Sequence, residues 1–447
     1  MGTIKQITGL RPCGAGLWRG GAGVLSAVVA SAVLAGSALA GTPRADCAGG
    51  SSRHGGCALM SSRSVREHRH RFTTINGLNT VANLASTVAT NKDANPYALA
   101  IAPAVFNGVL NGKRTALQPG DLLISDFSNS TGAKTGTSIL LYRPSTGKIM
   151  PFYTEDIGAG PVAMAISALG ATWIANYLPG YTNSADGTTT GDGNVVVITP
   201  NGTAFPSNQG IIDNDSGASF SPASNMFAGP WGQAFAVKSG TTTPYFFVTE
   251  VDNGTGWVQR EEFTAPDFRQ ARVVTIGSLP VGANAFDPTG PQGMVYDPKR
   301  DILYVASTTT NSIVAFPHAT TSGPWMSSGV VVYQGAPLKA PVGLTMNPIN
   351  GDLIAANQLD NDIVEIAPEP YAEAGTYYFD AKPVGVRLVD RTPVNSAAGT
   401  GSALFGVVAS ETTHGDLLVY FVDSNTNSLD MLYHRSRGRS GTKTGAY

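Results

Sequence analysis

Charged residues are scarce in this sequence, since Asp, Glu, Lys and Arg make up 13% of its 447 residues, against about a quarter in an average protein. A helical pattern rich in Ala, Glu, Lys and Leu is also missing after the first 40 residues. These two absences argue against a helical protein. The sequence instead has 42% apolar residues, 53 glycines and 28 prolines, which predict an all-β fold with a core and many turns.

Familiar catalytic motifs are absent too: the sequence has no Gly-x-Ser-x-Gly elbow, no His-Glu-x-x-His zinc motif and no phosphate-binding loop. Histidine occurs in the body of the chain at His318 and His414, with His434 near its end. His414 precedes a predicted strand, where it is either a general base or a solvated loop side chain. Asp186 and Asp192 lie among glycines, which is the composition of a calcium loop without the spacing of an EF-hand.

Cysteine is limited to three residues, all within the first 57 positions. Residues 1–40 have the basic start, the uncharged stretch and the small-residue ending of a secretory signal peptide; a membrane anchor is the alternative, although the stretch is weakly hydrophobic. Cleavage near Gly41 would give a secreted or periplasmic protein without a membrane span. Cys47 and Cys57 are then expected to form a disulfide, unless they stay free thiols.

Positive charge is concentrated at the two ends of the mature chain. Residues 41–71, which we expect to form a flexible arm, contain six arginines against two acidic residues, and the basic tail 435–447 contains four basic residues and no acidic one. The whole chain has a formal net charge of −2, so the body 72–434 is acidic. An acidic body argues against a nucleic-acid partner, because phosphate binding needs a basic surface.

One strand pattern recurs six times along the body. Each copy has a short first strand with a small residue, a turn, a second strand that ends in a polar residue, a polar turn and a third strand. The six copies begin at Pro96, Pro161, Pro230, Pro291, Pro341 and Leu404. The small residues are Ala98, Ala163, Gly232, Gly293, Gly343 and Gly406.

A closed ring explains why such units repeat. Three or four antiparallel strands cannot bury two apolar faces alone, whereas blades packed face to face bury one another. We therefore predict that residues 72–434 form a β-propeller of six four-stranded blades, rather than five or seven blades or a pair of β-sandwich domains. The small residue of each first strand is expected at the crowded axis, where backbones come close and a Cβ is costly.

The pattern resembles the NHL repeat. In the best copy the resemblance rests on Gly293, Asp297, Pro298, Asn311 and Ile313, and the next copy follows closely. The resemblance implies a propeller, and many members of that family bind protein, peptide or nucleic-acid partners on one face of the ring while others are enzymes. The fold alone therefore indicates no particular function.

Polar residues end the second strand in five copies: Asp126, Asn176, Glu250, Asn357 and Asp423. The arrangement is similar to that of six-bladed calcium-dependent lactonases and gluconolactonase-like hydrolases, in which carboxylates and amides hold a metal in the central channel. This resemblance makes Ca²⁺ the candidate cofactor and these five residues its candidate ligands. Against it, Asp and Asn are favoured wherever a strand stops, and the Glu-Gly-Pro segment of that hydrolase family is missing.

Aromatic residues precede the small residue in three copies, as Tyr97, Trp231 and Phe405. We expect them at one mouth of the channel, where an aromatic rim suits a sugar, a cationic group or a peptide; packing between blades is the other interpretation. The leading hypothesis is a monomeric, secreted or periplasmic scaffold that binds a protein, peptide or carbohydrate on one face of the ring. The alternative is a Ca²⁺-dependent hydrolase or lactonase acting at the channel.

The sixth copy has three predicted strands, and the tail after His434 has no apolar run that could add a fourth. The candidate before the first copy is the segment 72–78, with an extension through Val81. We predict that this segment completes the last blade, because joining the chain ends removes an exposed strand edge.

Overall fold

The structure is a computed structural model, and it describes residues 72–129, 132–133, 135–154, 160–182, 189–205, 211–212, 219–221, 227, 229–237, 244–251, 256–263, 270–283, 288–323 and 328–435. The expected signal peptide, the arm with Cys47 and Cys57, the side chains of Asp186 and Asp192 and the tail beyond Arg435 lie outside the described residues. Within these ranges the one helix is the 3-10 turn η1 (Ile75–Gly77), and no helix is long and apolar enough to cross a membrane.

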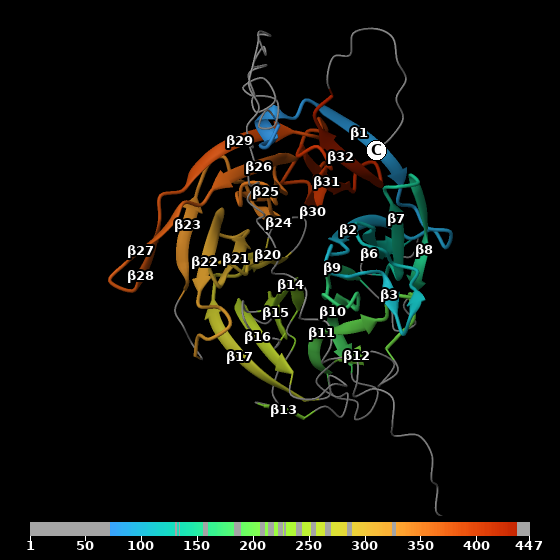
Figure 1. Ribbon diagram of the computed structural model, residues 1–447, viewed down its shortest axis with the longest axis horizontal. Helices are drawn as coiled ribbons and strands as arrows, with labels where there is room; N and C mark the ends of the chain where they lie inside the picture. Colours follow the sequence, from blue (N-terminus) through green and yellow to red (C-terminus); the bar gives the residue numbers. More distant parts are fainter. Residues whose placement is uncertain are drawn as a thin grey trace, which may run out of the picture. The chain divides into compact units, whose positions relative to one another are not determined.

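The strands confirm the predicted six-bladed, all-β propeller, in which six antiparallel sheets are arranged around an axis (Figure 1). Each blade runs from an inner to an outer strand. Blade 1 consists of β2 (Ala94–Ile101), β5 (Leu122–Asn129), β7 (Ser138–Arg143) and β8 (Lys148–Thr154); blade 2 of β9 (Pro161–Ile166), β10 (Thr172–Thr182), β11 (Thr189–Ile198) and β12 (Ile211–Ile212); blade 3 of β14 (Pro230–Val237), β15 (Pro244–Glu250), β16 (Trp257–Phe263) and β17 (Gln270–Ser278).

The other three blades follow the same order. Blade 4 consists of β20 (Pro291–Asp297), β21 (Ile302–Ser307), β22 (Ser312–Pro317) and β23 (Val330–Gln334); blade 5 of β24 (Pro341–Met346), β25 (Leu353–Asn357), β26 (Asp362–Ala367) and β29 (Lys382–Leu388); blade 6 of β30 (Leu404–Glu411), β31 (Leu417–Asp423), β32 (Ser428–Tyr433) and β1 (Thr80–Ser86).

Short strands lie outside this plan. Three hairpins are formed by β3 (Val109–Leu110) with β4 (Lys113–Arg114), β18 (Gly282–Ala283) with β19 (Pro288–Thr289), and β27 (Pro370–Glu373) with β28 (Thr376–Phe379). In addition, β6 (Gly132–Ala133) pairs with β5, and β13 (Ser219–Ser221) runs parallel to β17.

Burial falls from the middle of each blade to its rim, and this explains the residue patterns. Every residue of β21 and β25 is buried, because both faces of these strands pack on neighbouring blades, so they are almost continuously apolar. The rim strands β8 and β29 are mostly exposed and half-buried and carry lysine and arginine. The apolar core therefore lies between successive blades.

The small residues of the inner strands do lie where neighbouring backbones come close. A Cβ on Gly293 of blade 4 would lie 2.5 Å from the carbonyl oxygen of Val342 in blade 5, and one on Gly343 would overlap the carbonyl oxygen of Phe405 in blade 6. A Cβ on Gly406 would lie 2.6 Å from the backbone nitrogen of Leu99 in blade 1. The inner strands thus contact one another in sequence around the ring.

The chain ends close the ring, as predicted, but through a different segment. The outer strand of blade 6 is β1, which pairs antiparallel with β32 from Thr80 opposite Tyr433 to Ser86 opposite Ser428. The prediction that residues 72–78 supply this strand is wrong, because the Asn-Gly pair within them forms the turn η1. Ile75 of that turn is fully buried, and its N–H donates to Oε2 of Glu365 in blade 5 at 2.7 Å.

Candidate functional site

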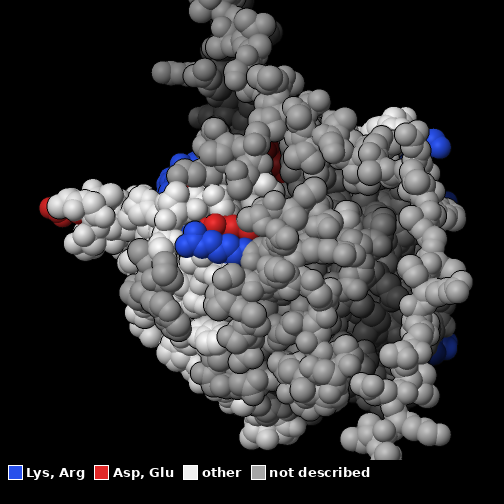
Figure 2. Space-filling model, turned by 90° about the horizontal axis from the view of Figure 1, so that it is seen from below, with Lys and Arg blue, Asp and Glu red and all other residues white. Residues whose placement is uncertain are grey.

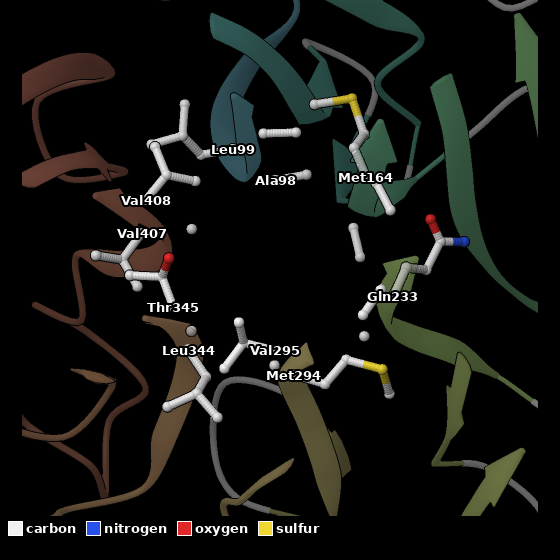
Figure 3. Close-up of a pocket in the computed structure, with 18 of the residues that line it drawn as sticks. Ala98, Leu99, Met164, Gln233, Met294, Val295, Leu344, Thr345, Val407 and Val408 are labelled. Atoms are coloured by element: carbon white, nitrogen blue, oxygen red, sulfur yellow. The ribbon is translucent and has the colours of Figure 1, made fainter. Parts of the chain in front are cut away.

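A cavity of about 290 Å³ lies on the axis, between the six inner strands β2, β9, β14, β20, β24 and β30 (Figure 3). Its walls are made of the small residues at the inter-blade contacts and the residues that follow them. Two positions beyond the small residue, the side chains are again short: Ala100, Ala165, Ala234, Val295, Thr345 and Val408. Short side chains at two successive levels leave the space open.

Most side chains that line the cavity are apolar, but polar atoms supply about as much of its surface as apolar atoms do. Leu99, Met164, Met294 and Leu344 are drawn around it in Figure 3, and none of the lining residues carries a charged side chain. The polar side-chain groups belong to Tyr97, Trp231, Gln233, Tyr296 and Thr345. The hydroxyl of Tyr296 donates to Oδ1 of Asp301 at 3.1 Å. Such a lining suits a small, uncharged ligand that offers both apolar and polar contacts.

The three predicted aromatic residues are brought together at one end of this cavity. The ring of Tyr97 lies between those of Phe127 and Phe405, with centroids 4.1 and 3.7 Å away, and the centroid of Trp231 is 6.3 Å from it. Tyr177 meets Trp231 edge to face at 5.4 Å. Because strands from blades 1, 3 and 6 supply Tyr97, Trp231 and Phe405, this aromatic layer crosses the axis and forms the floor of the cavity.

The three aromatic side chains are too deeply buried to form the open rim that the sequence predicted. Tyr97, Trp231 and Phe405 are only 6%, 3% and 5% exposed. They lie together at one end of the cavity, and much of each ring contacts other rings rather than solvent. That these three residues contact a ligand stays a prediction. In this structure a ligand could reach only the parts of their rings that line the cavity.

The five polar residues lie at equivalent points of five blades, opposite a residue at or near the start of the inner strand. Asp126 pairs with Pro96, and Asn176, Glu250, Asn357 and Asp423 pair in the same way with Pro161, Pro230, Pro341 and Leu404. All five are at most 5% exposed, and none of them lines the cavity. They therefore surround the axis at the end where the aromatic layer lies.

Asp126 is the least satisfied member of this set. Neither of its carboxylate oxygens has a hydrogen-bond partner among the described residues, and burial, with a smaller contribution from the charge of Asp93, raises its pKa to about 8. Asp423 differs, because it accepts hydrogen bonds from the backbone N–H groups of Asn425 and Thr426 at 2.9 and 3.1 Å. Burial is also the main cause that raises the pKa of Asp423.

The side-chain amides of Asn176 and Asn357 each donate a hydrogen bond but have an oxygen that accepts none from the described residues. The Nδ2 of Asn176 donates to Oδ1 of Asn194 at 2.9 Å, and the Nδ2 of Asn357 donates to the carbonyl oxygen of Pro337 at 2.9 Å. The Oδ1 atoms of Asn176 and Asn357 have no partner in the described part of the chain. Unpartnered oxygens of this kind have the chemistry of calcium ligands.

The spacing of the possible metal ligands argues against a metal site. Across the described residues, no three side chains of the types His, Cys, Asp and Glu come together in a way that could hold an ion. A site here would depend on the amides of Asn176 and Asn357 beside Asp126, so the ligand role of the five residues remains a prediction. His414 is exposed in the turn between β30 and β31 and does not line the cavity.

Sequence reasoning missed the cavity itself. Its signal was present in the short residues two positions after Ala98, Ala163 and Gly232, which are all alanine. A short residue in an inner strand is equally compatible with tight packing, however, and the number of blades decides how wide the axis is. The lining becomes recognisable once six inner strands are known to face one axis.

No family model matches the chain. No curated protein matches it either, so the resemblance to the NHL repeat is not confirmed. Solved structures do resemble it. A protein described as a putative 6-phosphogluconolactonase from Bacteroides uniformis is 17% identical, with 78% of this chain and 88% of that chain covered and a TM-score of 0.40.

Two further solved structures are similar at the same level. The periplasmic gluconolactonase of Pseudomonas aeruginosa is 14% identical over 72% of this chain and 84% of its own, with a TM-score of 0.40. An auxiliary nutrient binding protein from Bacteroides thetaiotaomicron is 12% identical over 70% of this chain and 65% of its own, with a TM-score of 0.41. Likeness of this degree concerns the arrangement of strands and carries no functional argument.

Proposed function

We propose that this chain is a non-enzymatic binding propeller of the cell exterior or periplasm, and that its axial cavity receives a small apolar ligand or an apolar side chain of a partner. The observation that carries the proposal is the cavity of about 290 Å³, whose walls carry short, uncharged and mostly apolar side chains and whose floor is aromatic. An engineered apolar cavity of about 150 Å³ holds benzene, so a space of this size takes a small aromatic or branched aliphatic group.

The chemistry of the lining favours binding over catalysis. General acid–base catalysis needs an ionisable group within hydrogen-bond reach of the substrate. Among the described residues that line the cavity, the ionisable side chains are the tyrosines Tyr97 and Tyr296, and none is a carboxylate, histidine, cysteine or lysine. Burial, with the nearby charges of Asp301 and Asp297, raises the pKa of Tyr296 further above its usual range. Thr345 points into the space and offers a hydroxyl that can orient a ligand (Figure 3).

Thermal unfolding with small apolar probes, indole and cyclohexanol, tests the proposal. A ligand at about 100 times its Kd stabilises the folded state by about 2.7 kcal/mol, so the melting temperature should rise with probe concentration. Ala165→Leu fills the cavity and should abolish this rise, while Ala372→Leu, on an exposed hairpin, should keep it. The melting temperature of each variant without probe shows that it is folded. Equal responses of both variants would refute binding in the cavity.

Asp126, Asn176 and Asn357 have oxygens without a hydrogen-bond partner among the described residues, and these oxygens favour a second candidate function, a Ca²⁺-dependent hydrolase or lactonase. These three residues, with Glu250 and Asp423, would hold the ion, which would polarise a substrate carbonyl. Calorimetric titration of chelator-treated protein with Ca²⁺ tests this candidate. Binding should be lost in Asp126→Asn and kept in Asp360→Asn, a change at a surface ion pair with Lys339. A titration of the unaltered protein without heat of binding would remove this candidate.

A further inference from the structure

The hairpin of β27 and β28 is an insertion that the propeller plan does not require. It is placed between the third and fourth strands of blade 5, and in Figure 1 it projects away from the ring. Figure 2 shows the same projection at the left, with an acidic side chain at its end. A two-stranded hairpin is marginally stable by itself, so an insertion of this kind calls for an explanation.

One face of the hairpin anchors it to blade 4. Tyr377 meets the ring of His318 edge to face at 5.4 Å, and Phe379 meets Tyr304 at 6.1 Å. Both Tyr377 and Phe379 are half-buried. In this way β28 is fixed beside β23, and the position of the whole hairpin is set by aromatic contacts on one side.

The opposite face carries an exposed aromatic pair among carboxylates. Tyr371 and Tyr378 are direct cross-strand partners, their rings stack at 5.3 Å, and they remain 52% and 42% exposed. Glu373 lies two residues after Tyr371 in β27 and opposite Thr376 in β28, so strand alternation puts Glu373 and Thr376 on the same face as the two tyrosines. We call this face, made of Tyr371, Glu373, Thr376 and Tyr378, the tyrosine face; Glu369 and Asp380 lie at its base, just outside the two strands.

The tyrosine face keeps a negative charge. Lys382 bridges Glu369 and Asp380 with Nζ–oxygen distances of 3.1 Å each, which leaves two carboxylates sharing one cation at the base. Glu373, at the tip, forms no ion pair with any described residue. Stacked aromatic rings beside carboxylates attract a cation, because ring faces and carboxylates are both negative, and guanidinium groups also stack on tyrosine.

The outer edge of β27 is open as well. Within the described residues β27 pairs with β28 alone, so its other edge presents backbone N–H and C=O groups that an extended chain can pair with. We propose that the hairpin is a docking site for an extended, arginine- or lysine-bearing segment of a partner protein, which adds as a third strand beside β27 and lays its cations on the tyrosine face. This proposal is independent of what the axial cavity binds.

Fluorescence anisotropy with the full chain and a labelled heptapeptide that alternates arginine with threonine and valine tests the proposal. Replacing the arginines of the peptide by glutamine should weaken binding about tenfold or more, and so should Tyr371→Ser combined with Tyr378→Ser. Hydrogen exchange of the backbone of residues 370–373 should slow when the arginine peptide binds, as expected for strand addition at β27.

A matched pair of charge variants separates this site from general attraction to an acidic protein. Glu373→Gln removes the tip carboxylate of the tyrosine face, and Glu411→Gln removes an exposed carboxylate at the end of β30 in blade 6. Binding should weaken severalfold in the first variant and stay unchanged in the second. Absence of peptide binding, equal loss in both variants, or full binding by the double serine variant would each overturn the proposal.

Discussion

Glu261 is a buried acid, and its removal should stabilise the protein in a pH-dependent way. Its side chain is fully buried in β16, neither carboxylate oxygen has a hydrogen-bond partner among the described residues, and burial raises its pKa from 4.5 to about 8. The strand register sets it beside Phe246 and Val273, which are apolar. In the folded protein the carboxyl is therefore protonated near neutral pH.

The direction in which stability changes with pH follows from the protonation of Glu261 in the folded and the unfolded protein. Below pH 4.5 the carboxyl is protonated in both states and does not change stability. Between pH 4.5 and about 8 the unfolded chain loses the proton while the folded protein keeps it, so stability falls as the pH rises and is constant above that window. Each pH unit inside the window is worth about 1.4 kcal/mol, which gives a cost of about 3 kcal/mol at pH 7.

Glu261→Met replaces the acid by an apolar side chain of similar length and should remove this cost. Urea unfolding of both proteins at pH 5, 6 and 7 should show a stability difference that grows by about 1.4 kcal/mol per pH unit in favour of the variant. Other buried acids, such as Asp126, affect both proteins alike and cancel in the difference.

The neighbouring residue supplies the control. Glu262 points to the other face of β16 and forms ion pairs with Arg260 at 2.7 Å and Arg272 at 3.8 Å. Glu262→Gln should therefore lower stability or leave it unchanged. If the stability difference between Glu261→Met and the unaltered protein is the same at all three pH values, the carboxyl of Glu261 is not held neutral by burial and the reasoning fails.

Three further changes test the ring. Gly343→Val should lower the free energy of unfolding by about 3 kcal/mol or more, because its side chain would meet the carbonyl oxygen of Phe405; an unchanged urea midpoint would show that this contact is not tight. Tyr97→Ala removes the central ring of the aromatic layer and should cost about 3–5 kcal/mol by the same measurement, and a loss below 1 kcal/mol would contradict the stacking. Deleting residues 41–71 should leave the melting temperature unchanged, whereas deleting 41–86 removes β1 and should lower it sharply; equal melting of the two truncated proteins would speak against closure by β1.

Much of the fold could be predicted because its determinants are local. Turn residues and β-branched runs mark each strand, and a small residue such as Gly293 or Gly343 is required wherever inner strands touch. These signals recur in each copy, so the repeat reveals the blades even where one copy is weak.

The closing strand and the hairpin were harder to predict, since their partners are distant in sequence. The strand β1 alternates poorly and its pairing is irregular between Asn83 and Ala85, while the segment 72–78 alternates better but contains an Asn-Gly turn. The candidate site was hard to predict for the same reason, because its residues come from distant parts of the sequence. The positions of Tyr97 and Asp126 followed from the repeat, but their burial depends on how six blades meet at the axis, which no single copy reveals.

Joining the first strand to the last has a consequence for how the protein is made. The hydrogen bond between His434 Nδ1 and the carbonyl oxygen of Gly77 links residues 357 positions apart. At roughly 5–20 residues per second, a ribosome needs about 20–70 s between the two. During that time β1 has no partner and blade 6 does not exist, so the ring cannot be completed while the chain is being synthesised. Closure of the ring by β1 is therefore a folding step that follows the synthesis of the whole propeller, whatever the earlier blades do beforehand.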